Sequence, residues 1–159
     1  MSKQLVAYFS ATGTTARIAG KLAQALGADL HEIVPATPYS AADLDWRDAS
    51  SRSSVEMADR SSRPAIAGEP ASIASYERIW LGFPIWWYRE PSLIDTFLEA
   101  HDFAGKSIVL FATSGSSGFG QTATEVAGHV DASATIEEGT VLTAGSTEDE
   151  LEAWLASLQ

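Results

Sequence analysis

The residues best suited to chemistry lie in one short turn, residues 10–15, with the sequence SATGTT. The turn follows an apolar segment at 5–9, which is typical of a strand buried on both faces, and precedes a segment at 16–26 with helical periodicity. The first amides of a helix lack intrahelical partners and attract anions. Gly13 lets the backbone approach a ligand closely, and four hydroxyl groups surround these amides, those of Ser10, Thr12, Thr14 and Thr15.

The composition of this turn restricts the kind of anion that it suits. It lacks the Gly-Lys-Ser/Thr sequence of a triphosphate-binding loop and the G-x-G-x-x-G sequence of a dinucleotide site. We therefore interpret the turn as a site for one terminal phosphate monoester. The alternative is a helix cap rich in Ser and Thr that binds no ligand.

Two further apolar segments, 78–83 and 107–112, end in unusual loops. The first is followed by an aromatic loop of Pro84, Ile85, Trp86, Trp87 and Tyr88. The second is followed by a loop of small residues, Thr113, Ser114, Gly115, Ser116, Ser117 and Gly118.

The three loops are expected to meet, because parallel strands with right-handed crossovers place all their carboxyl ends on one edge of the sheet. Together they predict a pocket for a flat aromatic ring with a phosphate tail. Trp86 or Trp87 would stack on the ring, and glycine amides would approach its polar edge. A hydrophobic plug or a dimer surface is the alternative role for the aromatic loop.

These loops need strands that alternate with helices. We expect strands at 5–9, 29–34, 78–83, 107–112 and 135–142, the last interrupted near Gly139, and helices at 16–26, 92–100, 121–129 and 148–158. This alternation predicts an α/β fold with a doubly wound, five-stranded parallel sheet in a single domain, residues 1–159.

The segment 35–75 interrupts this pattern with four prolines and dense charges. A structureless segment of this length is unusual. We therefore expect an irregular insertion that covers part of the protein, with the candidate site as one such part, or that contains a short helix at 54–59. Trp46 is expected to anchor the segment to the body of the protein, with a lid over a ligand as the alternative.

The charge balance restricts the class of partner. Ten basic residues against 21 acidic residues give a net charge of −11, which argues against nucleic acid and against anionic membranes. It is compatible with a basic protein partner or with high solubility alone. No cysteine is present, so disulfides and thiol chemistry are excluded. The sequence has no apolar run of about 18 residues and no signal-peptide pattern after Met1, so a cytoplasmic protein is expected.

In its three loops the chain resembles the flavodoxin family. Residues 10–15 resemble the phosphate loop of that family, usually S/T-x-T-G-x-T, residues 82–88 resemble the first ring-binding loop of a branch with a Pro-x-Trp pattern, and residues 113–118 resemble the second. The resemblance spans nearly the whole chain and is weakest at 35–75. It implies a flavodoxin-like three-layer fold with strand order 2-1-3-4-5, and non-covalently bound FMN.

The resemblance also assigns the cofactor-binding residues and raises a question about mechanism. The residues implied to contact FMN are Ser10, Thr12, Gly13, Thr14, Thr15, Pro84, Ile85, Trp86, Trp87, Tyr88, Thr113, Ser114, Gly115, Ser116 and Gly118. Many electron-transfer flavodoxins carry a glycine in the first ring loop, whose peptide flips to favour the flavin semiquinone. Residues 84–90 (PIWWYRE) contain no glycine, and bulky residues tolerate a positive φ poorly.

Two functions follow from the resemblance. The first is an FMN-binding electron-transfer protein that serves redox partner proteins with basic docking surfaces. The second is a small FMN-dependent NAD(P)H:quinone oxidoreductase, in which the segment 35–75 shapes a substrate pocket.

Other chemistries find less support. A receiver-type signalling domain needs aspartates at its strand ends, whereas the first strand here ends in Phe9 and Ser10. The sequence GSSG at 115–118 is not the G-x-S-x-G of a serine hydrolase. His101 and His129 lie at predicted helix ends, where a cation is favoured. For Arg89 and Glu90 two roles stay open, control of access to the ring and plain surface charge.

Overall fold

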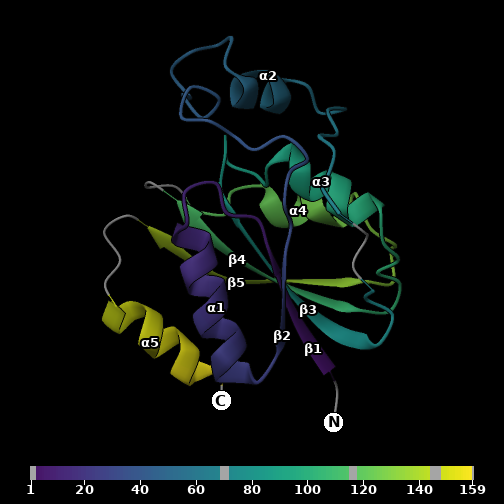
Figure 1. Cartoon of the computed structure of the whole chain (residues 1–159). Coiled ribbons are helices and arrows are strands. Elements are labelled where there is room, and N and C mark those ends of the chain that lie inside the picture. The colour runs from purple at the N-terminus through teal and green to yellow at the C-terminus, as the bar shows by residue number, and fades with distance from the viewer. Residues whose placement is uncertain (1–2, 69–71, 115–117, 144–147, 159) are drawn as a thin grey trace.

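A computed structural model describes residues 3–68, 72–114, 118–143 and 148–158. Its centre is a parallel five-stranded sheet of order β2-β1-β3-β4-β5 with helices on both faces (Figure 1). The strands are β1 (Lys3–Tyr8), β2 (Asp29–Glu32), β3 (Tyr76–Pro84), β4 (Ser107–Ser114) and β5 (Thr135–Thr143). The helices are α1 (Thr14–Leu26), α2 (Arg52–Ala58), α3 (Ser92–Glu99), α4 (Thr122–Ala127) and α5 (Glu148–Ser157). The predicted fold class and strand order are confirmed.

The apolar runs of the central strands follow from burial on both faces. Successive strand residues point to opposite sides of a sheet. In β1, Leu5 and Ala7 pack into a core shared with α3 and α4, whereas Val6 and Tyr8 pack into a second core shared with α1 and α5. Figure 1 shows these two pairs of helices on either side of the sheet. No polar face is left on β1, β3 or β4, so each reads as an almost continuous apolar run.

The outer strands differ from this pattern for local reasons. The four residues of β2 lie at the edge of the sheet, and three of them are exposed. In β5 the pairing with β4 shifts register between Leu110 and Phe111, where Gly139 stands opposite. A Cβ atom at Gly139 would lie 2.5 Å from the backbone oxygen of Leu110. The predicted interruption near Gly139 is therefore a β-bulge whose close backbone approach requires glycine.

The segment 35–75 contains the short helix that its sequence predicts, displaced by two residues at its start. Helix α2 begins after Ser51, whose hydroxyl accepts a hydrogen bond from the Ser54 amide. The ring of Tyr39 packs against Phe9, with ring centroids 5.7 Å apart, and so joins the segment to β1. Trp46 is 72% exposed. The residue that anchors the segment is therefore Tyr39, and the anchoring role expected of Trp46 is wrong.

The position of this segment matters for function. In Figure 1 its helix α2 and the chain around it lie at the top, at the end of the sheet opposite the N-terminus and hence beyond the carboxyl ends of the parallel strands. Among the residues that the structure describes, no helix has both the length and the apolar character needed to span a membrane.

Two glycine substitutions test the tight packing of β3. A Cβ atom at Gly82 would lie 2.2 Å from Cζ of Phe111, a ring that is buried in the core. We expect Gly82→Ala to lower the free energy of unfolding by about 1–3 kcal/mol through overpacking. In the control Gly20→Ala, the new methyl group meets open space on α1, and a gain of roughly 0.5–1 kcal/mol is expected. Urea unfolding measures both changes, and equal stability of the two variants would contradict the packing described here.

Candidate functional site

The turn between β1 and α1 is prepared for an anion. Gly13 caps α1 with a φ of +97°, a left-handed conformation that favours glycine, and its amide donates a hydrogen bond to Oγ of Ser10 at 2.9 Å. Gly13 has no side chain that could cap the helix, and the first turn of α1 contains no acidic residue. The positive end of the helix dipole therefore meets no protein carboxylate within the turn.

The hydroxyl groups of this turn divide into two kinds. Those of Thr12 and Thr14 belong to exposed residues and are accessible to a ligand, and Ser10 is half-buried. Thr15 is buried, with its Oγ1 atom 2.8 Å from Oγ1 of Thr113 at the end of β4. This buried hydrogen bond joins the first loop to the third, so the structure gives Thr15 a part in holding the loops together.

The aromatic loop forms a tight turn beside the other two. The Ile85 amide donates to the Thr113 oxygen at 2.8 Å, and the backbones of Trp86 and Arg89 exchange two hydrogen bonds of 3.1 and 3.3 Å. Between them, Trp87 and Tyr88 have φ values of 51° and 66°. Two positive φ values in a two-residue turn match type I′, which usually contains Asn or Gly.

Non-glycine residues in this region carry strain of about 1–3 kcal/mol each, so the surrounding contacts must hold the turn in place. Tertiary contacts therefore override the intrinsic preference of bulky residues for negative φ at Trp87 and Tyr88.

The two neighbouring tryptophans have different surroundings. Trp86 is half-buried and makes edge-to-face contacts with Phe9 and Tyr39, at centroid distances of 5.8 and 5.4 Å. Trp87 is 44% exposed and Tyr88 is 67% exposed. Trp86 therefore anchors the loop, and Trp87 is the tryptophan whose ring is available to a ligand.

The third loop is described only in part. Thr113 and Ser114 end β4, whereas Gly115 and Ser116 lie outside the described residues. Gly118 is exposed, and Gly120 has a φ of +56°, where an added Cβ atom would lie 3.1 Å from the Tyr88 oxygen. The buried Thr122 hydroxyl donates to the oxygens of Phe119 and Tyr88, the latter at 3.4 Å.

No motif in the sequence singled out Thr122 as a site residue. Its hydroxyl links the third loop to the aromatic loop, just as Thr15 links the first loop to the third. The hydrogen bond from the Phe9 amide to the Gly82 oxygen, 3.0 Å long, joins the ends of β1 and β3 as well. The structure thus brings the described parts of all three loops to one edge of the sheet. The assignments of individual residues to the cofactor site stay predictions.

Arg89 and Glu90 are buried, which corrects the expectation that they gate the ring or form surface charge. They are 5% and 0% exposed, and Asp95 beside them is 1% exposed. Nη2 of Arg89 donates to the Met57 oxygen at 3.0 Å, and Nη1 lies 3.6 Å from Oδ2 of Asp95. Burial, reinforced by the neighbouring Asp95 carboxyl, raises the pKa of Glu90 to about 9.

A cavity of about 410 Å³ lies between the segment 35–75 and the aromatic loop. The exposed rings of Trp46 and Trp87 both contribute to its wall. Its other lining residues are Arg47, Ala49, Ser54, Met57, Ala58, Arg60 and Arg89. A larger hollow of about 590 Å³ lies at the opposite edge, beside the strand starts at Gln4, Glu77 and Ser107, and is remote from the three loops.

Comparison with known proteins places this geometry in a family. The chain is 47% identical to a candidate flavoprotein from Bacteroides uniformis ATCC 8492, with a TM-score of 0.89 over 98% of both chains. A candidate flavoprotein from Bacteroides eggerthii DSM 20697 is 48% identical, with a TM-score of 0.87 over 99% of this chain and 98% of that one.

A more distant structure shares the fold. The flavoprotein of Lactobacillus acidophilus NCFM in complex with FMN is 18% identical, with a TM-score of 0.68 over 97% of this chain and 99% of that one. No curated protein sequence matches the chain significantly. The pattern of the Flavodoxin family matches residues 3–158, nearly the whole length. The chain therefore belongs to the flavodoxin family.

Proposed function

We propose that this protein binds FMN non-covalently and carries electrons between redox partner proteins. The observation that carries the proposal is the convergence of an anion-binding turn, an aromatic loop and a small-residue loop at one sheet edge, joined by the Thr15–Thr113 and Ile85–Thr113 hydrogen bonds. Membership of the flavodoxin family and the FMN complex of the Lactobacillus acidophilus structure support it. Bound flavin would supply the redox chemistry, and the protein supplies binding, orientation and electrostatics.

The residues of the first two loops have separate tasks in this proposal. The amides at the start of α1 and the hydroxyl groups of Thr12 and Thr14 receive the phosphate, because this end of the helix presents unpaired donors. The exposed ring of Trp87 covers the flavin ring, and Trp86 fixes the loop from behind through Phe9 and Tyr39.

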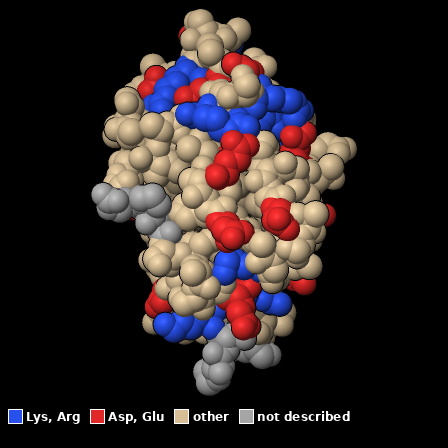
Figure 2. Space-filling model, turned by 90° about the vertical axis from the view of Figure 1, so that its right-hand side faces the viewer, with Lys and Arg blue, Asp and Glu red and all other residues tan. Residues whose placement is uncertain are grey.

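The charge distribution suits a basic partner. Acidic residues dominate the sequence from Glu90 onward, where Lys106 is the one basic residue. Four of the ten basic residues lie in the segment 35–75, namely Arg47, Arg52, Arg60 and Arg63, and Figure 2 shows Lys and Arg side chains gathered across the upper part of one face. The segment also contains six acidic residues, so the contrast lies with residues 90–159, which hold 12 acidic residues against Lys106. A basic partner is therefore expected to dock on the surface that residues 90–159 form.

Substitution of Trp87 tests which tryptophan serves the ring. We expect Trp87→Ala to raise the dissociation constant for FMN about 2- to 12-fold, because stacking beyond area burial is worth about 0.5–1.5 kcal/mol. Trp46→Ala, which removes the other exposed tryptophan, is the matched control and is expected to leave FMN affinity within about a factor of two. Quenching of flavin fluorescence during titration of the apoprotein measures both values. An unchanged affinity of Trp87→Ala would contradict the assignment.

Two glycine variants of α1 test the phosphate turn. Gly13 and Gly27 cap opposite ends of this helix, both with positive φ and with nothing within 4 Å of an added Cβ. Gly13→Ala and Gly27→Ala are therefore expected to lose similar stability, about 1–2 kcal/mol. Only Gly13→Ala should weaken the binding of FMN, because it alone distorts the anion-binding turn. Neither variant should weaken the binding of riboflavin, which lacks the phosphate. Comparable losses for FMN and riboflavin would argue against a phosphate site in this turn.

A specific observation favours the second candidate function, an FMN-dependent NAD(P)H:quinone oxidoreductase. The cavity of about 410 Å³ between the segment 35–75 and the aromatic loop has the size of a small-molecule site and adjoins Trp87. In an enzyme of this kind the cavity would receive the quinone, and Trp46 would line its binding site.

An anaerobic reductive titration of the FMN-loaded protein separates the two functions. For an electron carrier we expect a semiquinone to accumulate midway, because one-electron exchange with partner proteins needs that state. Direct passage from oxidised to fully reduced flavin, together with turnover of NAD(P)H and a quinone that Trp46→Ala impairs, would replace the carrier by the oxidoreductase. The visible spectrum and a steady-state assay record these outcomes.

A further inference from the structure

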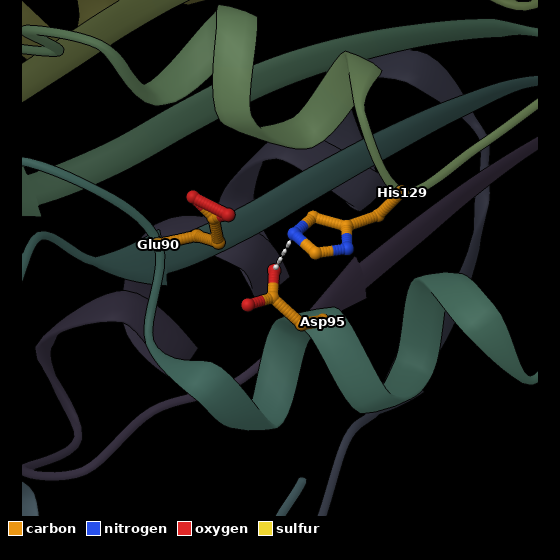
Figure 3. A group of neighbouring side chains, drawn as sticks. All are labelled: Glu90, Asp95 and His129. Carbon is orange, nitrogen blue, oxygen red and sulfur yellow. Dashed lines mark ion pairs between the residues drawn. The ribbon is translucent and has the colours of Figure 1, made fainter. Parts of the chain in front are cut away.

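Three side chains from distant parts of the sequence meet beneath the aromatic loop. Glu90 is the second residue after that loop, Asp95 lies in the first turn of α3, and His129 is the second residue after α4. One oxygen or nitrogen atom of each lies within 4.8 Å of the others. Figure 3 shows the two carboxyl groups and the imidazole ring pointing toward one another.

The two carboxyl groups are buried and short of partners. Glu90 is 0% exposed and Asp95 is 1% exposed. Among the described residues, no group donates a hydrogen bond to either carboxyl oxygen of Glu90 or to Oδ1 of Asp95. Burial of ionised carboxyl groups without compensation is costly, and a cation or a shared proton between the two groups would offset this cost.

The neighbouring arginines are directed elsewhere. Nη1 of Arg89 lies 3.6 Å from Oδ2 of Asp95, and Nη2 donates a hydrogen bond to the backbone oxygen of Met57. Arg63 binds Glu99 through Nε and Nη2, each at 2.9 Å. Oδ1 of Asp95 and both oxygens of Glu90 are therefore left facing the space that His129 borders.

His129 is oriented as a metal ligand would be. Its Nδ1 atom lies 2.8 Å from Oε2 of Glu99, a carboxylate that Arg63 fixes in place. When Nδ1–H donates to Glu99, the lone pair of Nε2 is free to bind a cation, and Nε2 lies 3.3 Å from Oδ1 of Asp95. A carboxylate behind a histidine ligand is the usual outer-sphere arrangement of protein metal sites.

We propose that Glu90, Asp95 and His129 bind one divalent transition-metal ion of the Zn²⁺ class. Two carboxylate oxygens and one imidazole nitrogen suit such an ion, which accepts three protein ligands and a water molecule. Mg²⁺ and Ca²⁺ prefer oxygen ligands alone. The ion would join α3 to the segments that follow α4 and the aromatic loop. The site lies outside the three loops assigned to FMN, so the proposal does not rest on the proposed function.

The experiment measures Zn²⁺ binding to the full chain after treatment with a chelator, with and without FMN. Calorimetry with ZnCl₂ is expected to show one ion per chain and a rise in melting temperature, because the ion binds the folded state. Glu90→Gln and Asp95→Asn keep the side-chain shapes and are expected to abolish this binding. Glu99→Gln leaves the three ligands in place and is expected to weaken it roughly 10- to 100-fold. Glu138→Gln, an exposed position on β5, is the matched control and should bind as the parent does.

A spectroscopic measurement on the unmodified sequence keeps the test valid if a variant fails to fold. In ¹⁵N-detected NMR spectra, Zn²⁺ is expected to shift the Nε2 resonance of His129 far more than its Nδ1 resonance. Absence of stoichiometric binding, or a His129 spectrum that Zn²⁺ leaves unchanged, would overturn the proposal and leave a pair of carboxyl groups that share a proton. Retention of full Zn²⁺ binding by a folded Glu90→Gln protein would overturn it equally.

Discussion

The arrangement of the whole site depends on the burial of both faces of the parallel sheet. Each central strand sends alternate side chains into two cores, one covered by α1 and α5 and the other by α3 and α4. Helices that cover both faces must return each chain segment to the same starting edge, so β1, β3 and β4 all end at the opposite edge. The three loops that follow β1, β3 and β4 are therefore neighbours, and the Thr15–Thr113 hydrogen bond joins the first of them to the third.

Within that frame, the aromatic loop is held from three sides. Its turn contains two left-handed residues, which are stable only because the flanking residues are constrained. Trp86 packs on Phe9 and Tyr39, and the buried Arg89 binds the backbone of α2. The exposed rings of Trp87 and Tyr88 thus project from a turn whose flanking residues, Trp86 and Arg89, are held by tertiary contacts.

The layered fold could be predicted from the sequence because it depends on local patterns. Apolar runs at β1, β3 and β4 give the buried strands, and even Gly139 marked the irregularity that became a bulge. The convergence of the three loops could be predicted for the same reason, since topology determines where the carboxyl ends of the strands lie. The sequence could not show that Arg89 and Glu90 are buried, because that depends on α2 and Asp95, which come from other parts of the chain.

The roles of the aromatic residues were hard to predict for a related reason. Adjacent tryptophans at 86 and 87 look equivalent in a sequence, and only the tertiary contacts of Trp86 separate them. Trp46 drew attention by its size, yet the smaller Tyr39 forms the contact that joins its segment to β1. Residue type alone therefore identified the aromatic character of the loop, but it did not separate the anchoring rings from the accessible ones.

The hydrogen bond from Arg89 to the Met57 oxygen has a consequence for how the protein tolerates deletions. Arg89 is 5% exposed, so its guanidinium group needs acceptors within the protein, and one of them comes from the segment 35–75. Removal of that segment would take away this acceptor and uncover the cation and the carboxyl groups beside it. The segment is therefore an integral part of the domain and cannot be trimmed as a surface loop could.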